Sequence, residues 1–529
     1  MNRLQLFVFR FYAFCFCAAL CHTAGATTCA SLVKLSLPQG RITLAVAEPA
    51  GTMTGLTDTP ISDLPAFCRV EATLKPSNDS NIRIEVWMPT TSWNGKYQGT
   101  GTGGYAGAIH YPSLINGIRR GYATANSDLG TSVPSGASAD ALVGHPERWK
   151  DWGYRATHAM TVAAKQIIEA YYGKQASRSY FIGCSTGGQQ ALVEAQRFPD
   201  DYDGIIAGAP ANNRTRLHMA FLWEESAAME TPESMIPLAK LQLISDAAVK
   251  ACPAQKAVAA DKFLSDPASC HWDPNELLCH GANAPDCLTA AQVTAVQKIY
   301  DGPKRLPMKH AQLAPLSLEL YPGLTRGSEL NWERVLSASG KPFMDSLFRW
   351  AFGADWNWRA FDFNQDVDAV DQALGPILNA TDPKLTLFKT HGHKLVVYHG
   401  WADAMVPSLE SINYLSRVEA AQAKDAAAHK RTNAEETASF YRLFMVPGMS
   451  HCGGGPGLTE IDALESLVLW TEKGIAPEKI IARRVDKEAT ELIRPVCPYP
   501  QTARYCGSGN VNDAMNFTCA TPAANGNAH

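Results

Sequence analysis

The sequence predicts an α/β protein with a mostly parallel β-sheet and a large helix-rich insertion. Short apolar strands alternate with amphipathic helices in the first part of the chain and again from residue 394, a pattern typical of α/β proteins. Between 212 and 385 the strands give way to helix-rich segments with many tryptophans and phenylalanines. The chain has 529 residues, 46% of them hydrophobic and 19% charged, so it is neither disordered nor fibrous.

The elements of the α/β pattern follow one another at short intervals. Ile82, Ile84 and Val86 alternate with polar residues until Pro89, which is typical of a strand. The other expected elements are a glycine-rich turn at 99–107, strands near 121–128, 179–182, 204–208, 394–400 and 440–448, and helices around 152–172 and 188–197.

These elements divide the chain into a catalytic domain and a lid. We assign residues 27–211 and 386–529 to one α/β domain, and residues 212–385 to the inserted lid domain. A segment inserted between strands usually covers the carboxyl ends of the sheet, where α/β proteins bind their ligands.

The first 26 residues are typical of a cleaved signal peptide. Arg3 precedes an apolar run, and Ala24-Gly25-Ala26 gives the small-x-small cleavage pattern. The alternative, a membrane anchor, needs about 20 apolar residues, and Arg10 interrupts this run. No later stretch is long or apolar enough to span a membrane, so we expect a secreted or periplasmic protein with no membrane contact after cleavage.

The charge balance gives no reason to expect a nucleic-acid partner. The chain has 47 basic and 51 acidic side chains, a net charge of -4, whereas nucleic-acid binding requires a basic surface. We expect the partner to be a small molecule.

The cysteines indicate an oxidising compartment. Three of the 14 cysteines lie in the predicted signal peptide, which leaves an odd number, so most should pair and one should remain unpaired. No C-x-x-C pair occurs, which argues against a zinc ribbon or a thioredoxin-type site.

A nucleophile motif lies between an expected strand and an expected helix. Residues 183–187, Gly-Cys-Ser-Thr-Gly, match G-x-S-x-G. In this context the motif forms a sharp turn that exposes the serine hydroxyl, and its glycines avoid collisions with the neighbouring strand and helix. The motif therefore predicts Ser185 as a nucleophile on an α/β-hydrolase fold. The alternative is a glycine-rich turn with a structural role only.

A serine hydroxyl needs a base to remove its proton and an acid to orient that base. Asp403 follows the strand 394–400, and His451 follows the strand 440–448. Both lie at carboxyl ends of strands, as Ser185 does, and the chain order serine, aspartate, histidine is that of α/β hydrolases. We therefore predict a triad of Ser185, Asp403 and His451.

A histidine cluster offers a competing functional site. His391, His393 and His399 lie close together in the sequence, but no carboxylate and cysteine pattern nearby completes a set of metal ligands. We interpret the three histidines as surface and loop residues.

An oxyanion hole needs two N–H donors aimed at the developing negative charge. The amide of Thr186 is one candidate because it follows the nucleophile, and Gly103-Gly104 resembles the HGGG-type element that supplies the other. We choose Gly104, with Gly103 as the alternative. A phosphate-binding loop is disfavoured because GTGTGG lacks the G-K-[ST] ending.

Several stretches together resemble the tannase/feruloyl esterase family, which includes the mono(hydroxyethyl)terephthalate hydrolases. They are GCSTGGQQAL, GWAD, PGMSHCGGG and RPVCPYPQTARY, and the resemblance covers nearly the whole mature chain. Its most specific element is the combination of Cys184-Ser185, Asp403 and His451-Cys452. The resemblance implies a serine, aspartate and histidine triad, a disulfide between the flanking cysteines, and cleavage of aromatic-acid esters beneath a lid.

The resemblance also implies a disulfide framework. Cys184 and Cys452 adjoin two side chains that must touch, so a bond between them is geometrically plausible; in the chain-entropy model it contributes about 5 kcal/mol. The implied pairs are Cys29–Cys68, Cys184–Cys452, Cys252–Cys270, Cys279–Cys287 and Cys497–Cys519, with Cys506 free.

The sequence departs from the family at a calcium loop. Pro253 and Lys256 stand where members carry the first two aspartates, and only Asp261 matches the third. Calcium needs six to eight oxygen ligands, and the lysine adds a repelling charge. We expect no calcium here and no cofactor, although Asp266 or Asp273 could rebuild a site.

Together these observations predict a secreted serine carboxylesterase that hydrolyses esters of aromatic or phenolic acids, of the feruloyl esterase or tannase type, through an acyl-enzyme. The alternatives are a peptidase on the same fold, or a binding protein that retains the fold without catalysis.

Overall fold

The computed structural model describes residues 28–134, 136–252, 261–305, 318–334, 336, 340–484 and 492–521. The predicted signal peptide lies outside these residues, as do positions 253–260 of the loop that corresponds to the family's calcium loop. Among the described helices, none has the length and hydrophobicity needed to cross a membrane.

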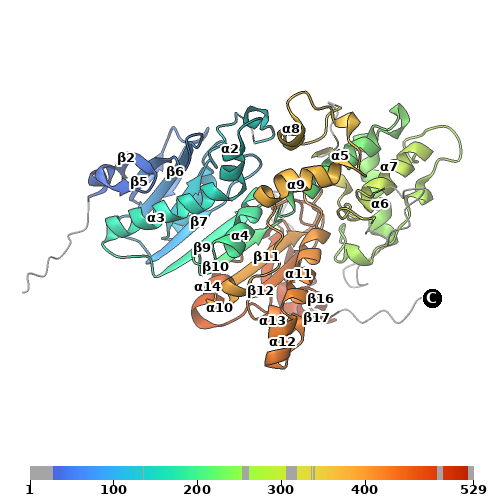
Figure 1. The fold of residues 1–529 in the computed structure, drawn as a ribbon. Coiled ribbons are helices and arrows are strands. Elements are labelled where there is room, and N and C mark those ends of the chain that lie inside the picture. Colours follow the sequence, from blue (N-terminus) through green and yellow to red (C-terminus); the bar gives the residue numbers. More distant parts are fainter. Residues whose placement is uncertain are drawn as a thin grey trace, which may run out of the picture.

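One long sheet, ten-stranded within the described residues, runs through the molecule (Figure 1). Its strands, in spatial order, are β1 (Ser36–Leu37), β2 (Gly40–Glu48), β5 (Phe67–Leu74), β6 (Ile82–Pro89), β8 (Ala123–Ser127), β7 (Lys96–Thr100), β9 (Arg178–Cys184), β10 (Gly204–Gly208), β11 (Lys394–Gly400) and β12 (Tyr441–Val446). Strands from β8 to β12 pair in parallel, which places the carboxyl ends of β9, β10, β11 and β12 at one edge.

The expectation of a mostly parallel sheet is correct only for this second half. β1, β2, β5, β6 and β8 pair antiparallel. The connection 75–81 between β5 and β6 is too short for the crossover that parallel strands need, so these strands can only form a hairpin. Alternation alone predicted the strands and not their direction.

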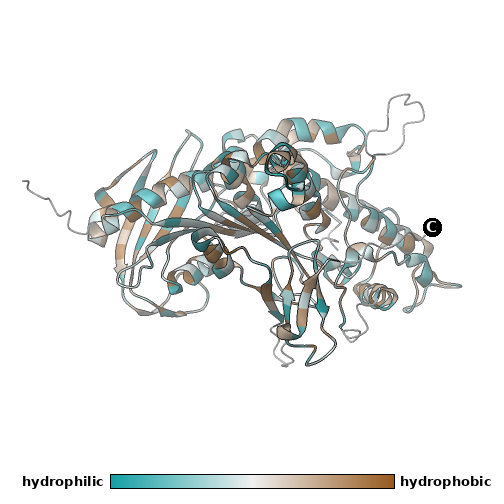
Figure 2. Cartoon of the chain, turned by 90° about the horizontal axis from the view of Figure 1, so that it is seen from below, coloured by the Kyte–Doolittle hydropathy of each residue, from teal (hydrophilic) through white to brown (hydrophobic). Residues whose placement is uncertain are grey.

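Helices cover both faces of the sheet. On one face lie α3 (Ala156–Tyr172) and α4 (Thr186–Arg197); on the other lie α1 (Tyr111–Arg119) and α14 (Leu464–Lys473). Figure 2 shows hydrophobic residues along the strands between these layers. Alternate residues of one strand serve opposite layers: in β10, Ile205 packs in the cluster that contains α3 and α4, and Ile206 in the cluster that contains α14.

The chain between β10 and β11 is mainly helical and gathers at one end of the molecule (Figure 1). Its helices are α5 (Arg214–Ala228), α6 (Leu238–Ala251), α7 (Ala290–Asp301), α8 (Ser346–Phe352) and α9 (Asp366–Leu378), followed by the short α10 (Thr386–Thr390). α5 is the first helix of the insertion. It packs against α7 and α9, so the beginning of the insertion contacts its later parts.

The remaining elements flank the main sheet. The helices are α2 (Pro146–Lys150), α11 (Leu409–Ala421), α12 (Ala423–His429) and α13 (Asn433–Thr437). The small sheets are β3 (Gly51–Met53) with β4 (Ile61–Leu64), β13 (Glu460–Ile461) with β14 (Ile480–Arg484) and β15 (Leu492–Val496), and β16 (Thr502–Tyr505) with β17 (Phe517–Ala520).

Two helix boundaries differ from the sequence expectation. The helix expected from about 188 begins at Thr186, so Gly187 and Gly188 are helical although glycine disfavours helices. The helix expected around 152–172 consists of a π-helical turn, Asp151–Arg155, followed by α3. Tertiary packing overrides local propensity at both places.

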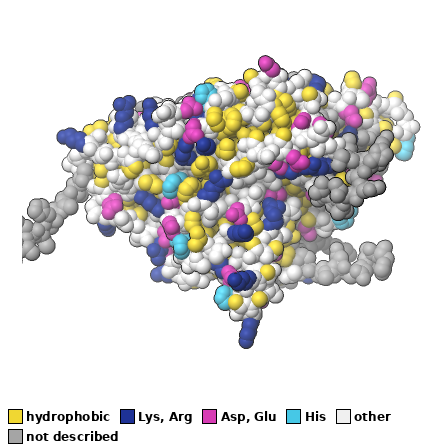
Figure 3. Space-filling view, in the orientation of Figure 1, with side chains coloured by type: hydrophobic (Ala, Val, Ile, Leu, Met, Phe, Trp, Pro, Cys, Tyr) yellow, Lys and Arg dark blue, Asp and Glu magenta, His cyan; other side chains and the backbone are white. Residues whose placement is uncertain are grey.

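The surface carries both signs of charge. Basic and acidic side chains are interspersed on the face seen in Figure 3. This distribution agrees with the small net charge of -4, and on this face the described basic side chains do not form the continuous surface that a nucleic acid requires.

Five disulfides join the described cysteines, and they are the five pairs that the resemblance implies. Their Cα–Cα distances lie between 5.0 and 5.9 Å, within the ordinary range for a disulfide. Cys506 is free and exposed. Such a framework is typical of proteins that fold in oxidising compartments.

We predict that iodoacetamide modifies only Cys506 in the folded, unreduced protein, because the other cysteines of the mature chain are bonded. Peptide mapping by mass spectrometry without reduction measures this directly. Alkylation of Cys184, or any bridged peptide that contains Cys506, would contradict the pairing.

Candidate active site

Ser185 occupies a strained turn between β9 and α4. Its φ is 65° and its ψ is -121°, a conformation that non-glycine residues rarely adopt and that is found where the surrounding structure enforces it. Ser185 N donates to Gly208 O at 3.0 Å, and Ala211 N donates to Ser185 O at 3.1 Å. These bonds to β10 and the loop after it hold the turn, which has the form of a nucleophile elbow.

Asp403 and His451 meet at the carboxyl ends of β11 and β12. His451 Nδ1 lies 2.7 Å from Asp403 Oδ2. Asp403 Oδ1 accepts hydrogen bonds from the backbone amides of Met405 and Val406, at 2.8 and 2.9 Å. The carboxylate is therefore fixed by its own loop and can hold the imidazole with Nδ1 protonated and Nε2 free to act as a base.

The Asp403 carboxyl is fully buried, yet its environment favours the ionised form. Burial by itself raises the pKa, but the nearby His451 charge and the hydrogen bonds from His399 and His451 outweigh it, and the pKa falls well below its ordinary value. Asp403 therefore stays negative throughout the range in which a histidine titrates.

A second imidazole contacts the same carboxylate, and sequence reasoning missed it. His399 Nε2 lies 3.2 Å from Asp403 Oδ2 and 2.9 Å from Val406 O, while its Nδ1 lies 2.7 Å from Ser411 Oγ. The interpretation of His399 as a surface or loop residue is wrong, since it is fully buried in β11. The signal that could have identified it is a histidine within a central strand, close after the apolar run 395–397.

The disulfide Cys184–Cys452 joins the elbow to the histidine loop. Its cysteines directly flank Ser185 and His451 and lie 268 positions apart in sequence, with Cα atoms separated by 5.9 Å. The bond therefore keeps the two loops together independently of any hydrogen bond between the side chains. Among the described hydrogen bonds, none joins Ser185 to His451; such contacts often form only when substrate binds.

Ser185 and His451 line a common cavity of about 270 Å³. Its walls are mainly apolar and come from the insertion and the Asp403 loop: Leu217, Phe221, Phe343, Met344, Met405 and Val406. Phe221 and Phe343 meet edge to face, with ring centroids 5.2 Å apart. An apolar cavity with two aromatic rings suits a planar aromatic group.

The amides of Thr186 and Gly104 lie at this cavity as expected for an oxyanion hole. Both residues line it. In the described part of the chain, neither backbone amide donates to a backbone carbonyl in the turns and loops. Gly104 has φ +55°, and a Cβ there would lie 2.4 Å from Gly136 O, so only glycine fits. Gly103, the alternative donor, lines the cavity too.

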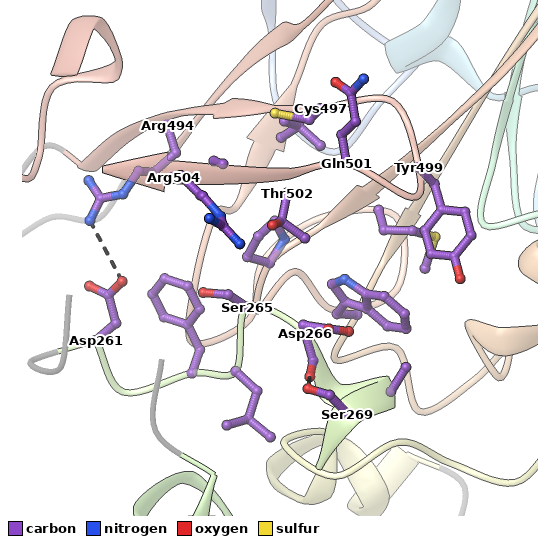
Figure 4. A pocket seen from close by; sticks show the side chains of 18 of the residues that line it. Asp261, Ser265, Asp266, Ser269, Arg494, Cys497, Tyr499, Gln501, Thr502 and Arg504 are labelled. Atoms are coloured by element: carbon purple, nitrogen blue, oxygen red, sulfur yellow. Dashed lines mark hydrogen bonds and ion pairs between the residues drawn. The ribbon is translucent and has the colours of Figure 1, made fainter. Parts of the chain in front are cut away.

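A larger cavity, about 930 Å³, lies elsewhere, between the segment 261–269 and the C-terminal strands (Figure 4). It contains neither Ser185 nor His451. Asp261 is the one residue that matches an aspartate of the family's calcium loop. It faces Arg494 in this cavity, with Asp261 Oδ2 and Arg494 Nη2 3.6 Å apart.

Two other groups of described residues have ligand atoms close enough to share a metal ion. They are Asp200, His391 and His393, and, next to them, His158, Glu194 and Asp201. No carboxylate pattern lies near these histidines in the sequence, but the fold brings Asp200 Oδ1 within 2.8 Å of His391 Nδ1. Neither group lies in the Ser185 cavity.

Comparisons with known proteins point to esterases along most of the chain. Residues 68–339 and 347–520 match the family model described as tannase and feruloyl esterase. The chain is 36% identical over 537 residues to an uncharacterized esterase of Xanthomonas campestris pv. campestris, covering 95% of this chain and 92% of that one. It is 30% identical over 474 residues to feruloyl esterase B of Aspergillus niger, covering 86% of each.

A solved structure supports the same similarity. The crystal structure of feruloyl esterase B from Aspergillus oryzae matches with a TM-score of 0.81 at 27% identity, covering 93% of this chain and 99% of that one. The predicted α/β-hydrolase fold with a helical insertion is therefore confirmed.

We predict that a fluorophosphonate probe attaches once per chain, at Ser185, because the strained turn presents that hydroxyl to the cavity next to a histidine base. Intact-mass and peptide mass spectrometry measure the attachment. Ser185→Ala should remain unlabelled, whereas Ser177→Ala, on the exposed approach to β9, should be labelled like the wild type. Labelling at another serine would contradict the site.

Proposed function

This chain belongs to the tannase and feruloyl esterase family and is a carboxylic ester hydrolase, and we propose that it acts as a serine esterase on esters of aromatic or phenolic acids. The observation that carries the proposal is the geometry of one cavity. Ser185 on its strained turn and His451, paired with ionised Asp403, line it together with apolar and aromatic side chains.

In the proposed mechanism the acyl group of the ester lies in the cavity with its carbonyl carbon at Ser185. The Ser185 oxygen attacks this carbon while His451 Nε2 removes the hydroxyl proton. The carbonyl oxygen becomes negative, and the amides of Thr186 and Gly104 donate hydrogen bonds to it. Asp403 keeps the imidazole oriented and stabilises its positive form.

The second half of the reaction repeats these roles. His451 gives its proton to the alcohol oxygen as the ester bond breaks, which leaves an acyl-enzyme. Water then enters, His451 removes its proton, and the hydroxide attacks the acyl carbon. The acid leaves when Ser185 recovers the proton from His451, so no cofactor is consumed.

The cavity walls favour an aromatic acid over an aliphatic chain. Phe221 and Phe343 can pack on a planar ring in the edge-to-face and offset arrangements that aromatic groups prefer. Among the related proteins, two carry the name feruloyl esterase B, which supports the same substrate class for this chain.

We predict that Ser185→Ala abolishes hydrolysis of feruloyl, galloyl and terephthaloyl esters while the protein folds normally. The loss in kcat should be on the order of 10⁴-fold or more, because triad members act as a unit. Initial rates on this ester panel measure it, with circular dichroism as the control for folding.

The same panel tests the alternatives. A peptidase would cleave peptide substrates faster than the esters, and a binding protein would show neither ester turnover nor labelling of Ser185. Retention of more than about a tenth of the wild-type rate by Ser185→Ala would contradict the proposed nucleophile.

We also propose that the protein is exported, to the periplasm or the medium. The disulfides, which require oxidising conditions, and the signal-like N-terminus support this location.

We propose further that the loop at Cys252–Cys270 holds no calcium. Asp261 already faces the cation Arg494, and Oδ1 of Asp273 accepts two hydrogen bonds from Asn275. The carboxylate oxygens left on Asp266 and Asp273 are too few for the six to eight ligands that calcium needs. The bridge Cys252–Cys270 would then hold the loop in place of a metal.

We predict that EDTA leaves the melting temperature and the esterase rate unchanged. Differential scanning fluorimetry measures the melting temperature, and initial rates on the ester panel measure the activity. Elemental analysis of the purified protein measures bound metal. One calcium per chain, with a clear drop in melting temperature on chelation, would contradict this proposal.

A further inference from the structure

Arg214 is a buried cation next to the predicted oxyanion hole. It is the first residue of α5, directly after the loop that follows β10, and is 2% exposed. Its guanidinium lies 4.9 Å from the ring centroid of Trp152, and the residue lines the Ser185 cavity. The mechanism described above does not use it.

The hydrogen bonds of Arg214 lead to the two amide donors. Nη2 donates to Thr186 Oγ1 at 2.8 Å, and Thr186 Oγ1 donates to Gly104 O at 2.9 Å. The direction of this chain is fixed, because a guanidinium can only donate and a carbonyl can only accept. The Thr186 hydroxyl therefore has one possible orientation, and it ties the nucleophile turn to the glycine loop.

Neighbouring groups hold both ends of this chain. Gly104 O also accepts from Trp152 Nε1 at 3.2 Å. Gln189 Oε1 accepts from Arg214 Nε at 2.9 Å and from Nη2. Gly104 O and the Arg214 guanidinium are thus each held by a second bond, and these side chains add to the backbone contacts that keep the Thr186 and Gly104 segments together.

The charge of Arg214 has no counter-ion among the described residues. Its polar partners are a neutral amide and a neutral hydroxyl, and its electrostatic neighbours, Tyr105 and Tyr321, are phenols. Burial lowers the pKa of Arg214 to about 10, so the guanidinium still carries its charge at neutral pH. A buried charge without a partner is unfavourable, and a negative charge formed in the cavity would relieve it.

We propose that Arg214 is a positioning residue of the oxyanion hole: it locks the Thr186 hydroxyl onto Gly104, and its unpaired positive charge favours the oxyanion formed there. This inference rests on the proposed esterase function. The charge is fixed in place before the reaction, which is the arrangement that stabilises a transition state most effectively. The negative charge on the carbonyl oxygen forms only in the transition state. We therefore expect the loss of Arg214 to raise the free energy of the transition state more than that of the bound neutral ester.

The central variant is Arg214→Met, which keeps a long apolar side chain on Trp152 but removes the charge and the hydrogen bonds. We expect kcat on a neutral feruloyl ester to fall about 100-fold, with KM changed less than about threefold. Arg197→Met is the matched control, because Arg197 also lies over an aromatic ring, Tyr154 at 4.7 Å, but on α4 outside the cavity. It should leave both constants unchanged.

Thr186 provides a second route that leaves the Arg214 side chain and its bonds to Gln189 in place. Thr186→Val removes only the hydroxyl and keeps the amide, so kcat should fall about tenfold. Thr186→Ser should recover most of this loss. In the double variant Arg214→Met with Thr186→Val, the loss in kcat should be smaller than the product of the two single losses. Both substitutions break the same chain of hydrogen bonds.

A binding measurement separates positioning from a loss of structure. An aryl boronic acid forms a negative tetrahedral adduct on a serine and resembles the transition state, whereas an uncharged aryl amide does not. Arg214→Met should weaken the boronic acid by about the same factor as kcat/KM and leave the affinity for neutral aryl ligands unchanged. Isothermal calorimetry on the full-length mature protein measures both.

Three outcomes with variants that carry Arg214→Met would overturn the inference. Arg214→Met with wild-type kcat would do so, and so would additive losses in the double variant. A loss confined to esters whose acid carries a carboxylate would mean that Arg214 binds a substrate anion instead. If Arg214→Met does not fold, Thr186→Val with unchanged kcat would decide against it. A wild-type protein without esterase activity would overturn the proposed function itself, and this inference with it.

Discussion

The close approach of backbones at the Ser185 turn is the constraint on which the rest of the site depends. A Cβ on Gly183 would lie 2.3 Å from Gly187 O, and one on Gly101 would lie 2.6 Å from Gly187 Cα. No side chain fits at these distances. The end of β7, the end of β9 and the start of α4 can therefore pack in direct contact, which brings the loop with Gly104 to the amide of Thr186.

This contact determines where the other functional groups must lie. The elbow is held to β10 by main-chain hydrogen bonds and to the histidine loop by Cys184–Cys452. Because disulfides restrict the unfolded chain as well as the folded one, this bridge also favours the arrangement in which β9 and β12 carry their loops to one edge.

The buried charges of the site are arranged in complementary ways. Asp403 is negative and is compensated by amides and by two imidazoles. Arg214 is positive and is compensated only by neutral groups. In the proposed mechanism, the stable negative charge supports the imidazolium of His451, and the positive charge of Arg214 suits the oxyanion that forms at the same time. Both charges lie in a low dielectric, where their effects are strongest.

The sequence by itself determined the elements whose signals are local. The strand β11 was predicted with its observed bounds, Lys394–Gly400. The predicted nucleophile turn, the positions of Asp403 and His451 after their strands, and the resemblance that implied the disulfides also came from short stretches of sequence. Glycines, apolar runs and flanking cysteines act within a few residues, so their meaning can be inferred without a fold.

Only the tertiary structure decided the distant contacts that no motif or family resemblance marks. The antiparallel direction of the first strands, the contact of His399 with Asp403, the position of Arg214 beside Thr186 and the pairing of Asp261 with Arg494 were not predicted. In each case the partners are placed by packing of whole elements, and the side chain carries no local mark of its partner. A histidine in a strand or an arginine at a helix start gains its role from the charge and burial that the assembled fold supplies.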